Sequence, residues 1–147
     1  DLDEKQVAGI AEELGATAVD AESLYEEPCD IFAPCAVGAI LNSETIARLD
    51  CKAIAGAANN QLEGPEDAER LHERGILYAP DFICNSGGAI ALCGLEALSM
   101  TDDYVAAKIL SIRDTLKVIF KEARENKESP LHAAERLARR VLERGPA

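Results

Sequence analysis

The sequence predicts an α/β protein with a mainly parallel sheet followed by long C-terminal helices. Short apolar runs alternate with segments in which apolar residues recur at helical spacing, as in strands joined by crossover helices. One run, Lys52–Ala57, consists almost entirely of small apolar residues, which is typical of a strand buried on both faces. From about residue 101 onward only helical periodicity remains. These observations predict a sheet with crossover helices over about residues 1–100 and C-terminal helices over about residues 101–147.

The first predicted element is a helix that starts after Asp3. The Asp3 side chain can cap this helix, Gln6 occupies the reciprocal capping position, and Gly15 ends the helix. Thr17–Val19 is then predicted to form a short strand. Asp30–Cys35 is predicted to form a second strand, and the proline within it ends the hydrogen-bonding ladder.

Two short crossover helices are predicted on either side of the small apolar strand. The first is capped by Asn42 or Ser43 and runs through Leu49. The second has Pro65 in its first turn and is closed by Gly75. Helices of this length are long enough to connect parallel strands across one face of a sheet.

The rest of the chain is predicted to hold one more strand, Ile76–Ala79, and three helices. The first helix begins near Gly88, the second covers about Asp102 to Glu125, and the third starts at Ser129-Pro130. The second carries an apolar stripe: Val105, Ile109, Ile112, Leu116, Ile119 and Ala123. We expect this stripe to pack against the sheet or against another domain, with a self-assembling coiled coil as the alternative.

The composition excludes several classes of partner. The chain has 147 residues, the length of one domain, with 27 acidic and 15 basic residues and a net charge of −12. This acidity argues against nucleic acid and against an anionic membrane surface, and no apolar run is long enough to span a bilayer.

The chain has five cysteines and two histidines without a CxxC motif, which predicts that it holds no metal site. The same cysteine pattern predicts reduced thiols in the cytoplasm. The chain begins at Asp1 and no signal-like segment follows, so we expect a cut end.

Three unusual loops follow predicted strands, at the edge of a parallel sheet where ligands bind. These loops are Pro34–Gly38, Ala57–Gln61 and Pro80–Gly88. The second holds three consecutive carboxamides, and carboxamides offer donors and acceptors without charge. They suit a neutral planar partner such as the carboxamide of nicotinamide, or a carboxylate or amine nearby. The alternative is structural: the asparagines turn the chain or cap a helix.

Cys35 lies in the first of these loops and is a candidate nucleophile. Catalysis by a thiol needs a positioned base, and neither His72 nor His132 is linked to Cys35 by a sequence pattern. A packed or cofactor-contacting thiol is therefore the favoured interpretation of Cys35.

Three segments of the sequence, Asp30–Ala36, Ile54–Leu62 and Tyr78–Gly88, resemble the glutamate/leucine/phenylalanine/valine dehydrogenase family. Its leucine dehydrogenase branch is the most similar. The resemblance implies NAD-dependent oxidative deamination of an L-amino acid, leucine-like and branched-chain, to a 2-oxo acid and ammonium. It also implies an incomplete Rossmann-like, doubly wound fold: the C-terminal NAD-binding domain without its first strand-helix-strand unit. No G-x-G-x-x-G motif is present, and the N-terminal catalytic domain of the family is absent.

The resemblance also implies the residues of the site. Asp1 matches the acidic residue that holds the adenosine ribose. The other positions implied to bind NAD are Pro34, Cys35, Ala36, Asn59, Asn60 and Asn85. The positions implied to bind substrate are Asn60, Ala89 and Leu92. No catalytic residue falls in this chain, since the catalytic lysines and aspartate of the family belong to the N-terminal domain. Ala89 is smaller than the valine common in leucine dehydrogenases, which leaves the amino acid open.

The sequence therefore leads to three hypotheses about function. The first is a part of an amino-acid dehydrogenase, inactive alone, whose full enzyme is a homo-oligomer. The second is a catalytically inactive binding or interaction module, motivated by the apolar stripe from Val105 to Ile119. The third is an α/β ligand-binding domain for another nucleotide or acid. Without the first unit, strand edges and an apolar face would be exposed, so we expect the isolated chain to be marginally stable.

Overall fold

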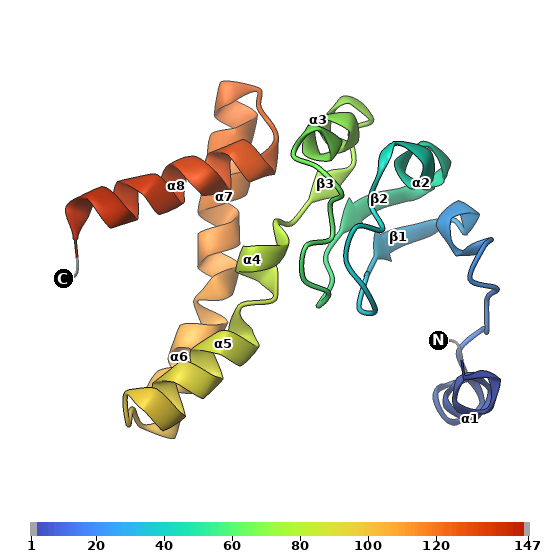
Figure 1. The fold of residues 1–147 in the computed structure, drawn as a ribbon, viewed down its shortest axis with the longest axis horizontal. Helices are drawn as coiled ribbons and strands as arrows, with labels where there is room; N and C mark the ends of the chain where they lie inside the picture. The colour runs from blue at the N-terminus through green and yellow to red at the C-terminus, as the bar shows by residue number, and fades with distance from the viewer. Residues whose placement is uncertain (1–2, 146–147) are drawn as a thin grey trace.

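The computed structural model describes residues 3–145. It has a small parallel sheet near its middle, a block of helices on one side and a separate N-terminal helix on the other (Figure 1). The helices are α1 (Glu4–Leu14), α2 (Ser43–Arg48), α3 (Glu66–Glu73), α4 (Asp81–Cys84), α5 (Gly87–Leu92), α6 (Asp102–Leu110), α7 (Ile112–Asn126) and α8 (Pro130–Arg144). A 3-10 turn (Leu24–Glu26) and a π-helical turn (Cys93–Ala97) complete the helical elements of this part of the chain. None of the helices described is long and apolar enough to cross a membrane.

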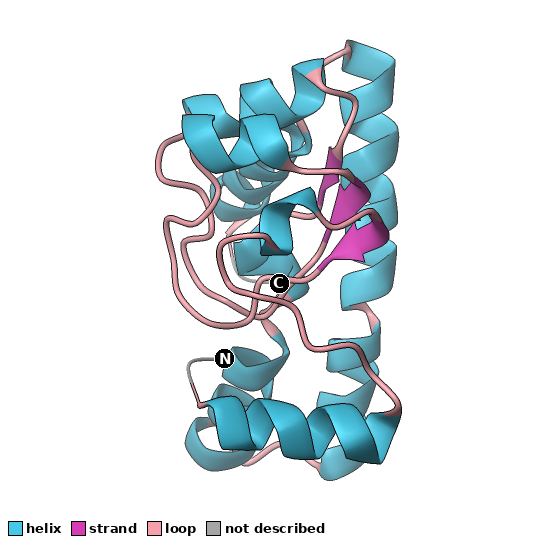
Figure 2. Ribbon diagram, turned by 90° about the vertical axis from the view of Figure 1, so that its right-hand side faces the viewer, coloured by secondary structure: helices cyan, strands magenta, loops and turns pink. Residues whose placement is uncertain are grey.

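The sheet has three strands: β1 (Cys29–Phe32), β2 (Cys51–Ile54) and β3 (Leu77–Tyr78). They are parallel and lie in the order β1-β2-β3, joined by the crossover helices α2 and α3. The predicted α/β class and parallel sheet are therefore confirmed. In the side view, the loops that connect these elements gather on one side of the strands (Figure 2).

The core of the sheet lies on the face covered by α2 and α3. Phe32, Ile54 and Tyr78 point into it from the three strands. The opposite face is more open, since Ile31 is 61% exposed and Leu77 is 43% exposed. In β2 itself Lys52 is exposed and Cys51 and Ala53 are only half-buried, so the prediction that the Lys52–Ala57 strand is buried on both faces is wrong. Only one face is covered within the described part of the chain.

Helix termini follow the capping chemistry that the sequence predicts. The Asp3 carboxylate accepts the backbone N–H groups of Lys5 and Gln6, and Gly15 ends α1 in a left-handed conformation. Asn42, not Ser43, caps α2. Because each cap satisfies backbone groups that have no partner inside the helix, α1 and α2 begin where the sequence predicts, and α1 also ends there. The structure ends α2 at Arg48 and α3 at Glu73, one and two residues before the predicted ends.

Two predicted elements differ from the structure. Thr17–Val19 forms no strand: it is exposed, and no strand of the described residues lies beside it to complete a ladder. The predicted helix Asp102–Glu125 is divided at Ser111, whose hydroxyl donates a hydrogen bond to the Lys108 carbonyl at 2.6 Å. Its apolar stripe is buried or half-buried, as predicted for a packing face.

A second core joins the C-terminal helices. Ile119 and Ala123 of α7 pack against Ala133 and Ala134 of α8. Ile83 of α4 is packed against the same cluster. The helical block is thereby attached to the segment that follows β3, which is one of the three loops predicted to form a site.

Candidate functional site

The three predicted loops meet at the carboxyl ends of the strands. The backbone N–H of Ala58 donates to the Pro34 carbonyl at 2.9 Å, which joins the loop after β2 to the loop after β1. The Asn85 side-chain amide donates to the Ala58 carbonyl at 3.2 Å, which joins the loop after β2 to the segment after β3. Parallel strands place their carboxyl ends at one edge, so residues far apart in the sequence come together there.

Two of the predicted asparagines are in direct contact. The Asn85 Nδ2 atom donates to Asn59 Oδ1 at 2.7 Å, a short bond between two side chains 26 residues apart. Asn60 lies beside them with φ of 51°, in the left-handed region that asparagine tolerates better than most residues. The three carboxamides thus form one polar cluster at the sheet edge.

Asp81 holds this cluster through the Asn60 backbone, although nothing in the sequence pattern singles Asp81 out. Its Oδ2 atom accepts the backbone N–H of Asn60 at 2.5 Å. Its Oδ1 atom accepts the Tyr78 hydroxyl at 3.4 Å, and its backbone N–H donates to the same hydroxyl at 3.3 Å. Burial, and then the Asp81 charge, raise the pKa of Tyr78, so this hydroxyl remains a neutral donor.

The backbone under the cluster is held by a buried side chain, Gln61. Gln61 is fully buried, and its amide donates to the carbonyls of Gly56 at 3.0 Å and Ala58 at 2.9 Å. The Cys84 thiol donates to the same Gly56 carbonyl at 3.2 Å, and burial raises the pKa of this thiol. The chain must be glycine at position 56, because a Cβ atom there would overlap the backbone of Pro34.

The asparagines line a cavity of about 640 Å³. Its lining residues are Ala57, Asn59, Asn60, Asp81, Phe82, Asn85, Ser86, Gly88 and Ala89. A smaller cavity of about 300 Å³ shares Ala57 and Asn85 with it and is also lined by Cys35 and Cys84. The two cavities are neighbours at Ala57 and Asn85, and together we call them the hollow, whose lining is rich in carboxamides and small residues. Such a surface can orient a planar polar group by hydrogen bonds while apolar atoms pack beside it.

The structure brings some of the predicted site residues together and separates others. Asn59, Asn60, Asn85 and Ala89 line the larger cavity, and Cys35 lines the smaller one. Pro34 and Ala36 line a neighbouring hollow beside β1. Leu92 lies on α5, is 57% exposed and lines neither cavity. Asp1 lies outside the described residues.

Other lining residues were not singled out from the sequence: Asp81, Phe82 and Ser86. Their only sequence signal is their place in the loop after a strand, which does not say which side chains face the hollow. Within residues 3–145, no group of three or more His, Cys, Asp or Glu side chains is arranged to hold a metal ion.

Comparison with known proteins decides the family. The family model for glutamate/leucine/phenylalanine/valine dehydrogenase matches residues 2–144. This chain belongs to that family. It is 41% identical over 143 residues to the leucine dehydrogenase of Geobacillus stearothermophilus, covering 97% of this chain and 39% of the relative. It is 37% identical over 151 residues to a phenylalanine dehydrogenase of Bacillus thermotolerans, covering 99% of this chain and 39% of that relative.

Solved structures agree with this assignment. The crystal structure of L-tryptophan dehydrogenase from Nostoc punctiforme matches with a TM-score of 0.90 and 41% identity, over 95% of this chain and 42% of that one. A hetero-hexameric glutamate dehydrogenase from Thermus thermophilus matches with a TM-score of 0.65, over 99% of this chain and 38% of that one. It is only 19% identical, so this match shows the shared fold alone. The chain therefore has the Rossmann-like fold of an amino-acid dehydrogenase. It spans about two fifths of the length of the relatives it matches.

Proposed function

We propose that this chain supplies the nicotinamide-binding surface and part of the substrate pocket of an NAD-dependent amino-acid dehydrogenase. The reaction is oxidative deamination of a leucine-like, branched-chain L-amino acid to a 2-oxo acid and ammonium. The observation that carries the proposal is the contact between Asn59 and Asn85, which gathers neutral carboxamides at the edge of a parallel sheet. The family relationship supports the same reaction class.

The residues present fit a nicotinamide group. Its carboxamide is neutral and planar, with both donors and an acceptor, and the side chains of Asn59, Asn60 and Asn85 offer the same complementary groups. Gly88 and Ala89 add little bulk to the hollow, so a ring can approach the backbone there. Bound NAD would supply the hydride acceptor. Pro34, Cys35 and Ala36 would lie along the cofactor, and Asp1 would hold the adenosine ribose.

The substrate would lie beside Asn60, with Ala89 next to it. None of the described residues that line the larger cavity is cationic, so the substrate carboxylate would need a partner from elsewhere in the enzyme. We therefore propose that an N-terminal domain binds that carboxylate and carries the catalytic groups. Residues 1–100 would supply the sheet and crossover helices of the cofactor domain, and residues 101–147 its C-terminal helices. We further propose that the full enzyme is a homo-oligomer, as the family relationship suggests. We propose a cytoplasmic location because all five cysteines are free thiols.

The interaction-module hypothesis loses its motivation in the structure. It depended on an exposed apolar stripe, but Val105, Ile119 and Ala123 are buried within the chain itself. The apolar residues that remain exposed near the site, Leu92, Leu95 and Leu98, fit contact with the proposed N-terminal domain.

The proposal is tested by joining this chain to the N-terminal part of its own protein and following NADH formation with L-leucine and other amino acids. We expect activity that falls about 10- to 100-fold in Asn85→Ala, since Asn85 would contact the cofactor. Asn126→Ala is the matched control, because Asn126 is exposed on α7, away from the hollow. An inactive joined protein, or equal activity in both variants, would contradict the proposal.

A further inference from the structure

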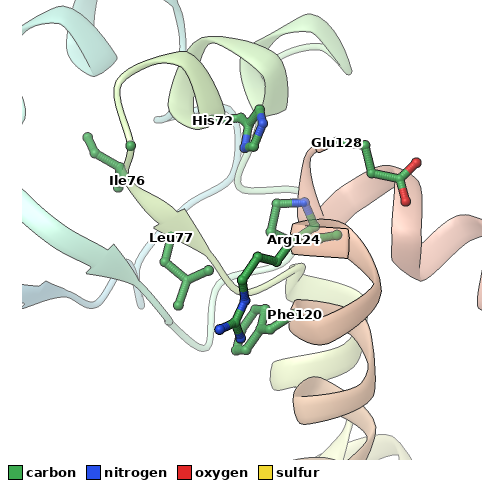
Figure 3. A pocket seen from close by; sticks show the side chains of 9 residues that line it. His72, Ile76, Leu77, Phe120, Arg124 and Glu128 are labelled. Carbon is green, nitrogen blue, oxygen red and sulfur yellow. The ribbon is translucent and has the colours of Figure 1, made fainter. Parts of the chain in front are cut away.

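A separate cavity lies between the sheet and the helical block (Figure 3). Its volume is about 410 Å³, within the range of about 300–1,000 Å³ typical of small-molecule sites. Residues from α3, β3, α7 and the start of α8 surround it. Its lining residues are His72, Gly75, Ile76, Leu77, Phe120, Ala123, Arg124, Glu128 and Pro130. None of them lines the carboxamide-rich hollow, so this cavity is independent of the proposed function.

Most of the wall is apolar. Ile76 and Leu77 form one side and Phe120 the other, and Leu77 keeps 43% of its surface exposed there. An apolar group of a ligand that covers this wall would stabilise the complex by about 25 cal/mol per Å² of apolar surface buried.

One charged group in this cavity has no charged partner among the residues that the structure describes. Arg124 of α7 makes no salt bridge to any of the residues described, and its side chain extends along Phe120 toward Leu77 (Figure 3). Glu128, the acidic residue of the lining, is engaged elsewhere: its carboxylate lies 2.5 Å from Arg136 of α8. The Glu128 charge is thereby neutralised outside the cavity, while the Arg124 guanidinium remains uncompensated in a chain of net charge −12.

We infer that this cavity binds a small carboxylate that carries a branched or aromatic apolar group. The guanidinium of Arg124 would take the carboxylate by paired hydrogen bonds, a geometry that its planar fork favours. The apolar part of the ligand would cover Leu77 and Phe120. His72, at the rim, can donate a further hydrogen bond to the anion.

The experiment is an NMR titration of the full chain with 3-phenylpropanoate, paired with the neutral 3-phenylpropanamide. We expect saturable shifts at Ile76, Leu77 and Phe120, and binding of the amide about tenfold weaker, because the charge-assisted bonds to Arg124 are lost. Arg124→Gln should weaken carboxylate binding about tenfold and leave amide binding unchanged. Arg113→Gln, an exposed position on the same helix, is the control and should change neither.

Three results would overturn the inference: no saturable binding, equal affinity for the acid and the amide, or shifts confined to residues outside this cavity. If Arg124→Gln does not fold, the comparison of acid and amide on the unaltered chain still decides the question. Activity of the dehydrogenase is not measured in this experiment, so its outcome is separate from that of the proposed function.

Discussion

The backbone N–H of Asn60 donates to the Asp81 carboxylate at 2.5 Å and joins two loops that are 21 residues apart. Asn60 is also held from the other side, because its carbonyl accepts the N–H of Ala39 at 2.7 Å. Both bonds fix Asn60 in a left-handed conformation that costs about 1 kcal/mol or more for a residue with a side chain. The position of the Asn60 carboxamide therefore depends on the backbone hydrogen bonds that Asn60 makes with Asp81 and Ala39.

Replacing Asp81 should loosen Asn60. Asp81→Ala leaves the Asn60 N–H without its acceptor, and a hydrogen bond to a charged group contributes about 1.5–3 kcal/mol, so we expect a loss of that size in unfolding free energy. Asp81→Asn keeps an oxygen acceptor and should lose less than half as much. Urea unfolding measures both, and Asp50→Ala, at an exposed position, is the control. Equal stability of the two Asp81 variants would contradict the role of the acceptor.

Glycine at position 56 should be indispensable. A Cβ atom there would overlap the Pro34 backbone, and backbone cannot move aside as a flexible side chain can. We expect Gly56→Ala to lower the free energy of unfolding by about 3 kcal/mol or more. Gly9→Ala is the matched control: Gly9 lies within α1 with open space around it, so alanine should be neutral or stabilise by up to about 1 kcal/mol. Thermal unfolding of both variants gives the comparison, and similar Tm values would refute the packing argument.

Much of this fold follows from interactions between neighbouring residues and could be predicted from the sequence. Most of the rest depends on pairing between residues far apart in the chain. The Asp3 and Asn42 caps depend on neighbouring residues only, so the sequence predicted the first cap and narrowed the second to Asn42 or Ser43. Thr17–Val19 has strand-like residues, but a strand also needs a neighbouring strand, which a local pattern does not reveal. The break at Ser111 arises from a hydroxyl bond that competes with helix continuation, and the apolar spacing continues through it.

In the candidate site, too, some residues could be predicted from the sequence, while others depend on contacts between distant loops. The carboxamides Asn59 and Asn85 stand out in the sequence by residue type and by their place after strands. Asp81 and Gln61 do not, since their roles depend on which backbone groups other loops bring to them. Leu92 shows why matching positions to a family in sequence alone can mislead. It follows Ala89 by about one helical turn, yet it lines neither cavity.

Gln61 should contribute less to stability than its complete burial suggests. Gln61→Leu removes two hydrogen bonds, but the Gly56 carbonyl keeps the Cys84 thiol as a donor and the Ala58 carbonyl keeps Asn85. The substitution also removes the Gln61 Oε1 atom, which is buried without a hydrogen-bond partner. We therefore expect a loss of about 1–2 kcal/mol in urea unfolding, below the sum for two unsatisfied groups. A loss above about 4 kcal/mol would show that the remaining donors do not compensate.

The ion network between α7 and α8 should make the stability of the chain depend on pH in the acidic range. Hydrogen bonds from Arg140 and Arg136 lower the pKa of Glu122, and a hydrogen bond from Arg136 lowers the pKa of Glu128. A carboxyl whose pKa is lower in the folded state stabilises the fold above its unfolded pKa and loses this contribution as pH falls through the folded value. We therefore expect Tm to decline as pH falls below about 4.5, the ordinary pKa of a glutamate side chain.

The decline in Tm should be shallower in a double variant that carries Glu122→Gln and Glu128→Gln. The control is Glu125→Gln, at an exposed position on α7, which should behave like the unaltered chain. Parallel declines in all three proteins would mean that the network is not the source of the acid sensitivity.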